Sequence, residues 1–366
     1  MIPIIIGILV FGVLILVHEA GHFAAARRNG ITVLEFAIGM GPKLFGVTKG
    51  DTLYSLRAIP LGGFCRMLGD ASEGDDNSQL SAEGALNTKP VWRRVIVFLA
   101  GSGANFALAF VLFTLAVSLV TFTVPVVNRT IEGMPAEAAG LLPGDRITRI
   151  DKTAIRVFND VTVALARSEG APMNVSVVRD GRRLDITITP VDIGGGVYRV
   201  GFEGRQMAGL LAPNPDGLER AGLFRSVSMG FWEGIRWINM TFFILGDLLS
   251  PAEDTTGVDQ LAGPIGVVNF IGEAYEAGAA NNVAASLMIH TLLLFSGILS
   301  ISIAIFNLLP IPALDGGRVV FLLIEGIRRK PIPPEKEGMI HFVGFMALIA
   351  LAIFVAYNDI VRIITS

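Results

Sequence analysis

Residues 2–30, IPIIIGILVFGVLILVHEAGHFAAARRNG, place two histidines and a glutamate directly after an almost unbroken apolar run. A helix that crosses a bilayer core of about 30 Å takes ~20 residues, and this run is long enough. No Lys or Arg precedes the run, and cleavage within Ala24–Ala26 would remove both histidines. We therefore expect a retained transmembrane helix rather than a signal peptide.

The composition agrees with a membrane protein. The chain has 366 residues, of which 52% are hydrophobic and 17% are charged, whereas soluble domains are nearer a quarter charged. Its formal net charge of -3 gives no support to nucleic-acid binding. The single cysteine, Cys65, excludes an intrachain disulfide and a cysteine-based zinc site. The length leaves room for one soluble domain beside the membrane part.

Apolar length predicts four spans and basic residues predict their direction. The four stretches are 2–24, 95–122, 285–309 and 339–357. Lys and Arg cluster between the first two spans and between the last two, so the positive-inside rule places both loops in the cytosol. Both termini and the segment from about 124 to 284 are then outside. Within that segment, the mixed stretch 229–249 predicts an amphipathic helix on the membrane surface or against the bundle.

The outer segment begins with a β-rich pattern. Residues 124–205 alternate as strands do, with turn signals at 142–145 and 179–182. A helix fits 158–170, with Asn159 or Asp160 as its N-cap. We expect a compact β-rich domain with one or two helices.

The first cytosolic loop is also rich in strand-forming residues. Residues 31–68 are too apolar for a plain aqueous loop and predict short strands or hairpins. Non-helical backbone enters a membrane only where protein buries it or it lines a wet cavity, so a sheet dipping into the bilayer beside the first helix fits. An interfacial hairpin without function is the alternative. Gly62 and Gly63 would permit close backbone approach or form a simple turn, and Pro60 would end or bulge a pairing edge.

The His-Glu-x-x-His set is typical of a metal site. His18 and His22 are four residues apart, so a helix presents both on one face. Glu19 beside them can take a proton from a water at the metal. The alternative is a pair of interfacial histidines at a helix end.

Zinc needs a third protein ligand and an open position, and depth helps to choose it. His18 lies about 24 Å along a helix that enters from outside, at 1.5 Å per residue, and so near the cytosolic boundary. His290 is near the outer end of the third span and is a poor candidate, whereas depth does not exclude His341. Asp315, in the proline-broken segment NLLPIPALDGG (307–317), lies at the right depth and is the best candidate. Its alternative role is an N-cap for the next helix.

These motifs together resemble one known family. The chain looks like the site-2 protease family, intramembrane zinc metalloproteases of the bacterial regulator-of-sigma-E protease type. The resemblance rests on HEAGH, on NLLPIPALDGG and on the outer domain between the second and third spans. Further similar stretches are FAIGMGPKLF (36–45), YSLRAIPLGGFCRMLGD (54–70), AGSGANFALAF (100–110), MPAEAAGLLPGDRITRID (134–151, similar to a bacterial PDZ core) and LAGPIGVV (261–268). The chain departs from the family in having Ser102 where a proline is usual, and one PDZ-like domain where the best-known enterobacterial members have two.

The resemblance implies a site and its cofactor. One Zn²⁺ would be held by His18, His22 and Asp315, with Glu19 as catalytic base. Asn307 and Asn105 match asparagines of the family motifs, of which Asn307 would support substrate binding. The substrate-binding candidates are therefore Asn307, Asn105, Gly62 and Gly63.

The resemblance also implies a polytopic α-helical membrane protein with a membrane re-entrant β-loop and one extracytoplasmic PDZ-like domain. The expected divisions are the first span with HExxH (1–26), the β-loop region (27–94), the second span (95–123), the PDZ-like domain (124–205), a linker with interfacial helices (206–284), the third span with the Leu-Asp-Gly motif (285–325), a cytosolic loop (326–338), the fourth span (339–358) and a tail (359–366).

The expected activity is cleavage of transmembrane segments in the bacterial inner membrane. Single-span anti-sigma factors and signal-peptide remnants would be substrates, membrane lipid a partner, and a peptide a ligand of the PDZ-like domain. Both termini and that domain would be periplasmic, with the site near the cytosolic side. One alternative is a catalytically inactive PDZ-bearing membrane scaffold, and another is a membrane-anchored zinc protease that acts on soluble peptides.

Overall fold

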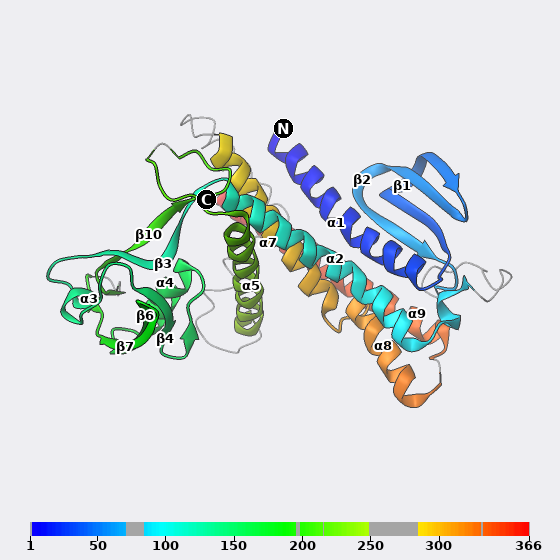
Figure 1. Ribbon diagram of the computed structural model, residues 1–366. Coiled ribbons are helices and arrows are strands. Elements are labelled where there is room, and N and C mark those ends of the chain that lie inside the picture. Colours follow the sequence, from blue (N-terminus) through cyan, green and yellow to red (C-terminus); the bar gives the residue numbers. More distant parts are fainter. Residues whose placement is uncertain are drawn as a thin grey trace. The chain divides into compact units, whose positions relative to one another are not determined.

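The computed structural model describes residues 2–70, 84–194, 198–214, 216–248, 285–330 and 332–365. The chain divides into two compact units, one formed by Met1–Leu112 with Arg236–Ser366 and the other by Phe113–Ile235. Figure 1 labels most elements of both. The motif at 261–268 and the remainder of the predicted linker up to 284 lie outside the described residues.

Four helices in the described part of the chain are long and apolar enough to cross a membrane. They are α1 (Ile2–Arg28), α2 (Val91–Ser118), α7 (Ala285–Leu308) and α9 (Pro334–Thr365). The four predicted spans are thus found as helices. Because α1 continues to Arg28, the two histidines stand within the helix rather than at its end, and α2 runs through Ser102 without a break.

One predicted boundary is wrong. The second helix ends at Ser118 rather than near 122, because Thr121–Thr130 forms strand β3, whose ladder with β10 starts at the pair of Thr121 and Ala208. The predicted proline break after the third span is present, and it divides 285–325 into two helices, α7 and α8 (Asp315–Arg328). A proline lacks the N–H that a helix interior needs, so the prolines after Leu308 end α7 there.

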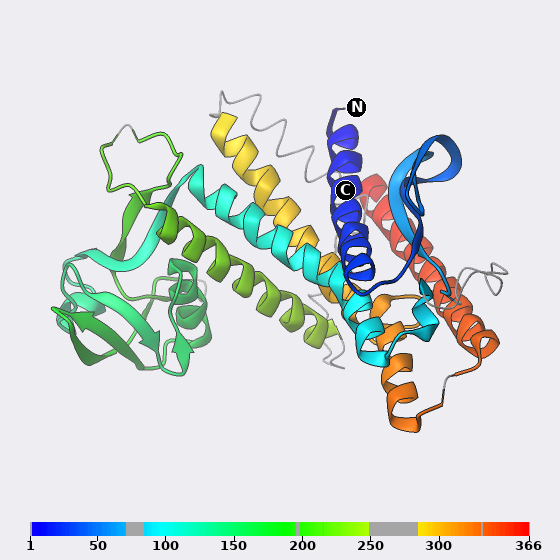
Figure 2. The same ribbon diagram turned by 45° about the vertical axis from the view of Figure 1, so that its right-hand side comes forward.

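The strand-rich loop is a single long hairpin. Strands β1 (Val33–Lys49) and β2 (Thr52–Met67) pair antiparallel, with repeated register shifts. Figures 1 and 2 both show the hairpin alongside α1. Side chains near its base, such as Val33, are buried, whereas those farther out, such as Leu44 and Phe45, are exposed. The predicted strands are therefore present, and their entry into a membrane remains a prediction.

Buried polar groups hold the hairpin and the short helix α8. Within the hairpin, the carboxylate of Glu35 accepts hydrogen bonds from Ser55 at 2.6 Å and from Arg57 at 2.7 Å. Arg94 on α2 forms a two-bond ion pair with Glu325 on α8. Charge-assisted bidentate pairs fix orientation as well as contributing free energy, so this pair sets how α8 lies against α2. A short turn of 3₁₀ helix, η4 (Leu86–Thr88), precedes α2.

The second unit is the predicted β-rich domain. Its main sheet has the strand order β10-β3-β4-β6-β7, with β5 paired to β4, and β8 pairs separately with β9. Its core includes Val127, Ile147, Val175 and Ile188, and helix α4 packs Val161 against them. The remaining bounds are α3 (Pro135–Ala138), β4 (Arg146–Ile150), β5 (Thr153–Ala154), α4 (Phe158–Arg167), β6 (Met173–Arg179), β7 (Arg182–Ile188), β8 (Val191–Asp192), β9 (Tyr198–Arg199) and β10 (Phe202–Ala208).

The predicted helices of this region are present with changed details: α4 starts at Phe158 as predicted but ends at Arg167 rather than 170, and its cap differs. Val157, rather than Asn159 or Asp160, is the N-cap of α4. Asp160 is the third helical residue, and its carboxylate accepts the backbone N–H groups of Arg156 and Val157 at 2.7 and 3.0 Å. The helix expected at 229–249 is α5, which begins at Leu223 and ends at Leu248.

Candidate metal centre

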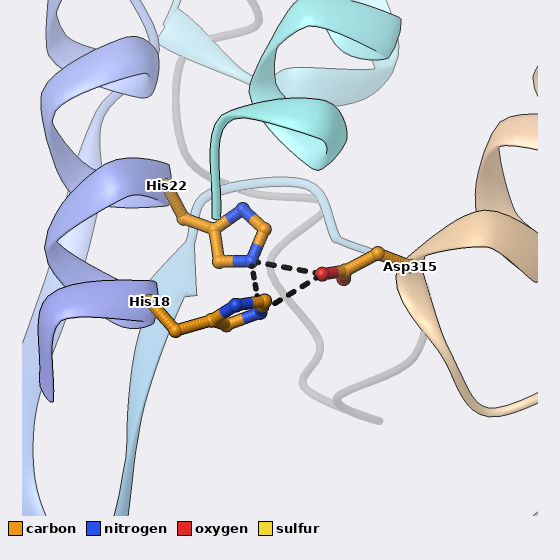
Figure 3. Close-up of side chains that lie close together, drawn as sticks. All are labelled: His18, His22 and Asp315. Carbon is orange, nitrogen blue, oxygen red and sulfur yellow. Dashed lines mark hydrogen bonds and ion pairs between the residues drawn. The ribbon is translucent and has the colours of Figure 1, made fainter. Parts of the chain in front are cut away.

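Three ligand-type side chains from two ends of the chain meet at one point. His18 and His22 project from α1, and Asp315, the first residue of α8, points toward both (Figure 3). Nε2 of His18 lies 3.0 Å from Oδ2 of Asp315, and Nε2 of His22 lies 3.1 Å from the same oxygen. The two Nε2 atoms are 3.1 Å apart.

The break after α7 brings Asp315 to this point. Leu314 occupies the N-cap position of α8 and makes no side-chain cap bond. Asp315 stands one residue later, where its carboxylate meets the imidazoles. The alternative in which Asp315 serves as the N-cap is therefore wrong. The predicted juxtaposition with His18 and His22 is present, since these are the residues that the described part of the chain gathers into a ligand cluster.

The three donor atoms fit a zinc ion. Val97 on α2 offers a carbonyl oxygen 2.8 Å from Nδ1 of His22, and because a carbonyl only accepts, Nδ1 carries the hydrogen and Nε2 keeps its lone pair. Two imidazole nitrogens and a carboxylate are ligands that zinc prefers. Ligand atoms of a tetrahedral zinc with 2.0–2.1 Å bonds are about 3.3 Å apart, close to the spacings seen here. Both histidines are buried, at 6% and 5% exposure, so the cluster is shielded from bulk water.

Helix α2 packs against the ring faces through a glycine. A Cβ added at Gly101 would stand 2.8 Å from Cε1 of His18 and closer still to Nε2 of His22. A real Cβ cannot occupy that space, so glycine is what allows α2 to approach the imidazoles.

A cavity of about 360 Å³ opens beside the cluster. Glu19, Asn307 and the strand residues Gly62 and Gly63 line it together with the metal-ligand candidates. Both glycines lie inside β2, so the interpretation of them as a simple turn is wrong. Asn105 is not among the lining residues: it is fully buried on α2, and its backbone oxygen accepts a hydrogen bond from Ser300 on α7 at 2.8 Å.

The hairpin holds Glu19 in place. The backbone of Cys65 on β2 hydrogen-bonds the Glu19 carboxylate. A Cβ added at Gly63 would stand 3.8 Å from Cγ of Glu19 and 2.7 Å from the carbonyl oxygen of Ala37 on β1. The strand therefore passes close to the glutamate, and a carboxylate beside three ligand atoms is well placed to exchange protons with a bound water.

The sequence did not single out three residues at the site. Arg318 and Cys65 line the cavity, and Arg318 stands one turn after Asp315 on α8, a spacing that could have indicated it. Val97 contributes only its backbone, for which no sequence signal exists. The two remaining histidines differ: His290 lies on α7 outside the cluster, and Nδ1 of His341 on α9 accepts the backbone N–H of Ala313 at 2.8 Å. The depth of His341 along its span does not exclude it as a metal ligand, but in the structure its ring is bonded to the Ala313 backbone instead.

Comparison with known proteins agrees with this chemistry. A family model, Peptidase family M50, matches residues 6–351. A Clostridium perfringens protein with the provisional name zinc metalloprotease CPE1693 is 37% identical over 358 residues, which cover 98% of each chain. Zinc metalloprotease RasP of Geobacillus kaustophilus is 30% identical over an alignment that covers 96% of each chain. The RasP of Shouchella clausii is also 30% identical, over 97% of this chain and 98% of that one. The chain therefore belongs to peptidase family M50, the site-2 protease family of zinc metalloproteases.

Proposed function

We propose that this zinc metalloprotease is an intramembrane endopeptidase that cleaves transmembrane segments of other membrane proteins. The observation that carries the proposal is the position of the HExxH face: it lies on a helix fit to span a membrane and closes on Asp315, which follows another such helix. Ionisable groups inside a membrane are costly and mark functional sites. His18, His22 and Asp315 are the proposed zinc ligands and Glu19 the proposed catalytic base.

When bound, the zinc ion supplies Lewis-acid activation of a water molecule and of the scissile carbonyl. Glu19 takes the proton of the attacking water and then passes it to the leaving amine. Cys65 and Gly63 keep the carboxylate at the cavity wall, where it can reach both positions. The bond between His22 and Val97 keeps Nε2 of His22 directed at the cluster. Asn307 lines the same cavity. Its Nδ2 donates to the Ile303 carbonyl oxygen at 3.0 Å, so its Oδ1 and second N–H are the groups that it offers to the substrate backbone.

Apolar substrates are the class that the surroundings of the site favour. The cavity is also lined by Ile15, Phe64 and Ile303, which suit a segment taken from a membrane. A helical substrate must unwind, because its carbonyls are bonded within the helix. The hairpin of β1 and β2 is a two-stranded sheet in the described chain, so an outer edge can receive the unwound segment by strand addition. Pro60 interrupts the donor row of β2.

The expected substrates are single-span proteins such as anti-sigma factors and signal-peptide remnants in the bacterial inner membrane. The positive-inside pattern places both termini and the β-rich unit in the periplasm, with the metal centre toward the cytosolic side. We propose that this unit is a PDZ-like domain that excludes bulky substrates or binds a peptide. In support, its main sheet has β10 at one edge, where a peptide could add a strand. A cavity of about 720 Å³ lined by Phe158, Phe202 and Gly204 lies beside it.

The test uses the purified full-length chain, reconstituted with single-span substrates, beside its Glu19→Gln variant. Wild type should cut within the apolar segment, and the variant should be about 10²–10⁴-fold slower because general acid–base catalysis is lost. Both should hold one zinc ion. A wild type that contains zinc and cuts no membrane-embedded segment would contradict the proposal. Unchanged substrate binding and no cleavage by either protein would favour a scaffold, and cleavage of soluble peptides alone would favour a surface protease.

A further inference from the structure

The backbone just before the third ligand adopts an unusual conformation. Ala313 has a φ of 81°, in the left-handed region that residues with a Cβ rarely enter. Such a conformation persists only where the surrounding structure determines it. Ala313 is two residues before Asp315, so its backbone angles set where α8 starts and where the Asp315 carboxylate points.

One histidine of α9 engages this residue. The backbone N–H of Ala313 donates to Nδ1 of His341 at 2.8 Å. Because an N–H only donates, Nδ1 of His341 is an unprotonated acceptor. The ring is buried, at 8% exposure. It also contacts the Phe321 ring of α8, with centroids 5.3 Å apart, and its Nε2 lies 3.8 Å from Oε1 of Glu337.

The same face of α9 makes a second close contact with the loop. A Cβ added at Gly344, one turn after His341, would stand 2.6 Å from both Cβ and the carbonyl oxygen of Pro312. Residues three apart share a helix face. Thus α9 contacts the Pro312–Ala313 peptide at two positions: His341 supplies a hydrogen-bond acceptor, and Gly344, which lacks a side chain, allows close packing.

We propose that His341 is a positioning residue of the metal centre. By accepting the Ala313 N–H, it holds the left-handed turn from which Asp315 reaches His18 and His22. The inference rests on the proposed role of Asp315 as a zinc ligand. In this role His341 neither binds the metal nor takes part in catalysis. Its Nδ1 fixes the backbone of Ala313, and that backbone determines where the Asp315 carboxylate points. Partners that orient metal ligands in this way typically change metal affinity 10–100-fold when they are removed.

Two substitutions of similar size separate the acceptor from the bulk of the ring. In His341→Asn, the side-chain oxygen takes the place of Nδ1 and can accept the Ala313 N–H. In His341→Leu, no acceptor remains. The measurements, on the full-length protein, are zinc affinity by competition with a chelator and the visible spectrum of the cobalt-loaded protein, which reports ligand geometry without any activity assay. We expect His341→Leu to bind zinc about 10–100-fold more weakly with an altered cobalt spectrum, and His341→Asn to resemble wild type.

Further variants keep the test decisive. Gly344→Ala should disturb Pro312 and change the cobalt spectrum although His341 is intact, whereas Val343→Ala, at a side chain 61% exposed, should change neither readout. The inference is overturned if His341→Leu matches wild type, or if His341→Asn is as weak as His341→Leu. An Asp315→Ala variant distinguishes failure of the His341 inference from failure of the proposed ligand set. If Asp315→Ala loses zinc while His341→Leu does not, only the inference about His341 fails. If Asp315→Ala retains wild-type affinity, the proposed ligand set itself is wrong.

Discussion

Nδ1 of His22 on α1 donates its hydrogen to the carbonyl oxygen of Val97 on α2, across 2.8 Å. The bond fixes one tautomer of the imidazole, and the lone pair of Nε2 therefore faces His18 and Asp315. Ligating histidines in metalloproteins usually have such a partner on the second nitrogen. A backbone carbonyl cannot be removed by substitution, so the helix pair itself determines the orientation of this ring.

The histidines of α1 and α7 should differ in their effect on metal content. His22→Ala removes one of three donor atoms, and we expect the purified protein to bind zinc at least about 100-fold more weakly, beyond the effect of losing an outer partner. His290→Ala changes a histidine outside the cluster and should leave one zinc ion per chain. Elemental analysis after dialysis against a weak chelator measures both, and equal zinc loss from the two variants would contradict the assigned ligands.

A methyl group on α2 should disturb the metal centre where it faces the imidazoles. Gly101→Ala introduces a Cβ against His18 and His22, so either the rings rotate or the helices separate. Overpacking of this kind costs about 1–3 kcal/mol, and we expect lower thermal stability together with weaker zinc binding. Gly103→Ala is the matched control, because its added Cβ meets no atom within 4 Å. If Gly101→Ala binds zinc like Gly103→Ala, the close packing of α2 on the rings is not as described.

Crowding the hairpin should reduce catalysis and spare the metal. Gly63→Ala forces the Ala37 carbonyl away and thereby shifts β2, which carries the Cys65 backbone that hydrogen-bonds Glu19. We expect kcat on a membrane substrate to fall by about 10²-fold, since small misplacement of a catalytic group has effects of this size, with one zinc ion retained. Gly46→Ala in β1 brings its Cβ closest to the flexible end of Leu53, at 3.1 Å, while Lys43 and the Tyr54 carbonyl oxygen lie at an ordinary 3.4 Å, so it should keep most activity. Loss of zinc from Gly63→Ala would show that the hairpin supports the ligands rather than the base.

The stability of the β-rich unit should depend on acid through Asp145. Its side chain is fully buried, and burial raises the pKa of the carboxyl group. Hydrogen bonds from Arg179 and from the Leu142 N–H lower that pKa by more, so it lies below its ordinary value. At a pH near the ordinary value of about 3.9, the unfolded chain binds more protons than the folded one, and stability rises with pH. The stabilisation is thus present above that pH and is lost as the pH falls through the folded pKa.

This dependence can be measured by hydrogen exchange of β6 and β7 in the full-length protein, corrected for the intrinsic rate at each pH. Wild type should open more easily at pH 3 than at pH 6. Arg179→Met removes the two guanidinium bonds to Asp145 and leaves the buried carboxylate without its cationic partner, so it should destabilise the unit at pH 6 and reduce the difference between the two pH values. An acid response unchanged by Arg179→Met would mean that other carboxyl groups dominate.

Local patterns in the sequence were sufficient to predict the core of the site. The four-residue spacing of His18 and His22 requires only that α1 be a helix, and the depth argument that selected Asp315 requires only the spans. The strands of 31–68 and of 124–205 could also be predicted locally, because alternation of apolar and polar residues indicates a strand. Each of these predictions depends on residues close in sequence.

The features that the sequence could not indicate arise from contacts between distant segments. Helix α2 ends at Ser118 because β3 pairs with β10, about 80 residues later. Val97 contributes only its backbone carbonyl, and the left-handed conformation of Ala313 depends on His341 from another helix. Asn105 matched a motif, yet its side chain is buried away from the cavity. A motif gives the position of a residue on its helix, but it does not say which other segment that residue will contact.

Asp315, the third proposed ligand, follows His18, the first, by 297 residues, and this separation has a consequence for biosynthesis. A ribosome that adds 5–20 residues per second takes about 15–60 s to cover that distance. Throughout this interval the first helix is inserted with two histidines and no carboxylate from α8. The nascent chain therefore cannot assemble its hydrolytic centre while its earlier helices are being inserted into the membrane. The order of translation delays the onset of proteolysis until α8 has been synthesised.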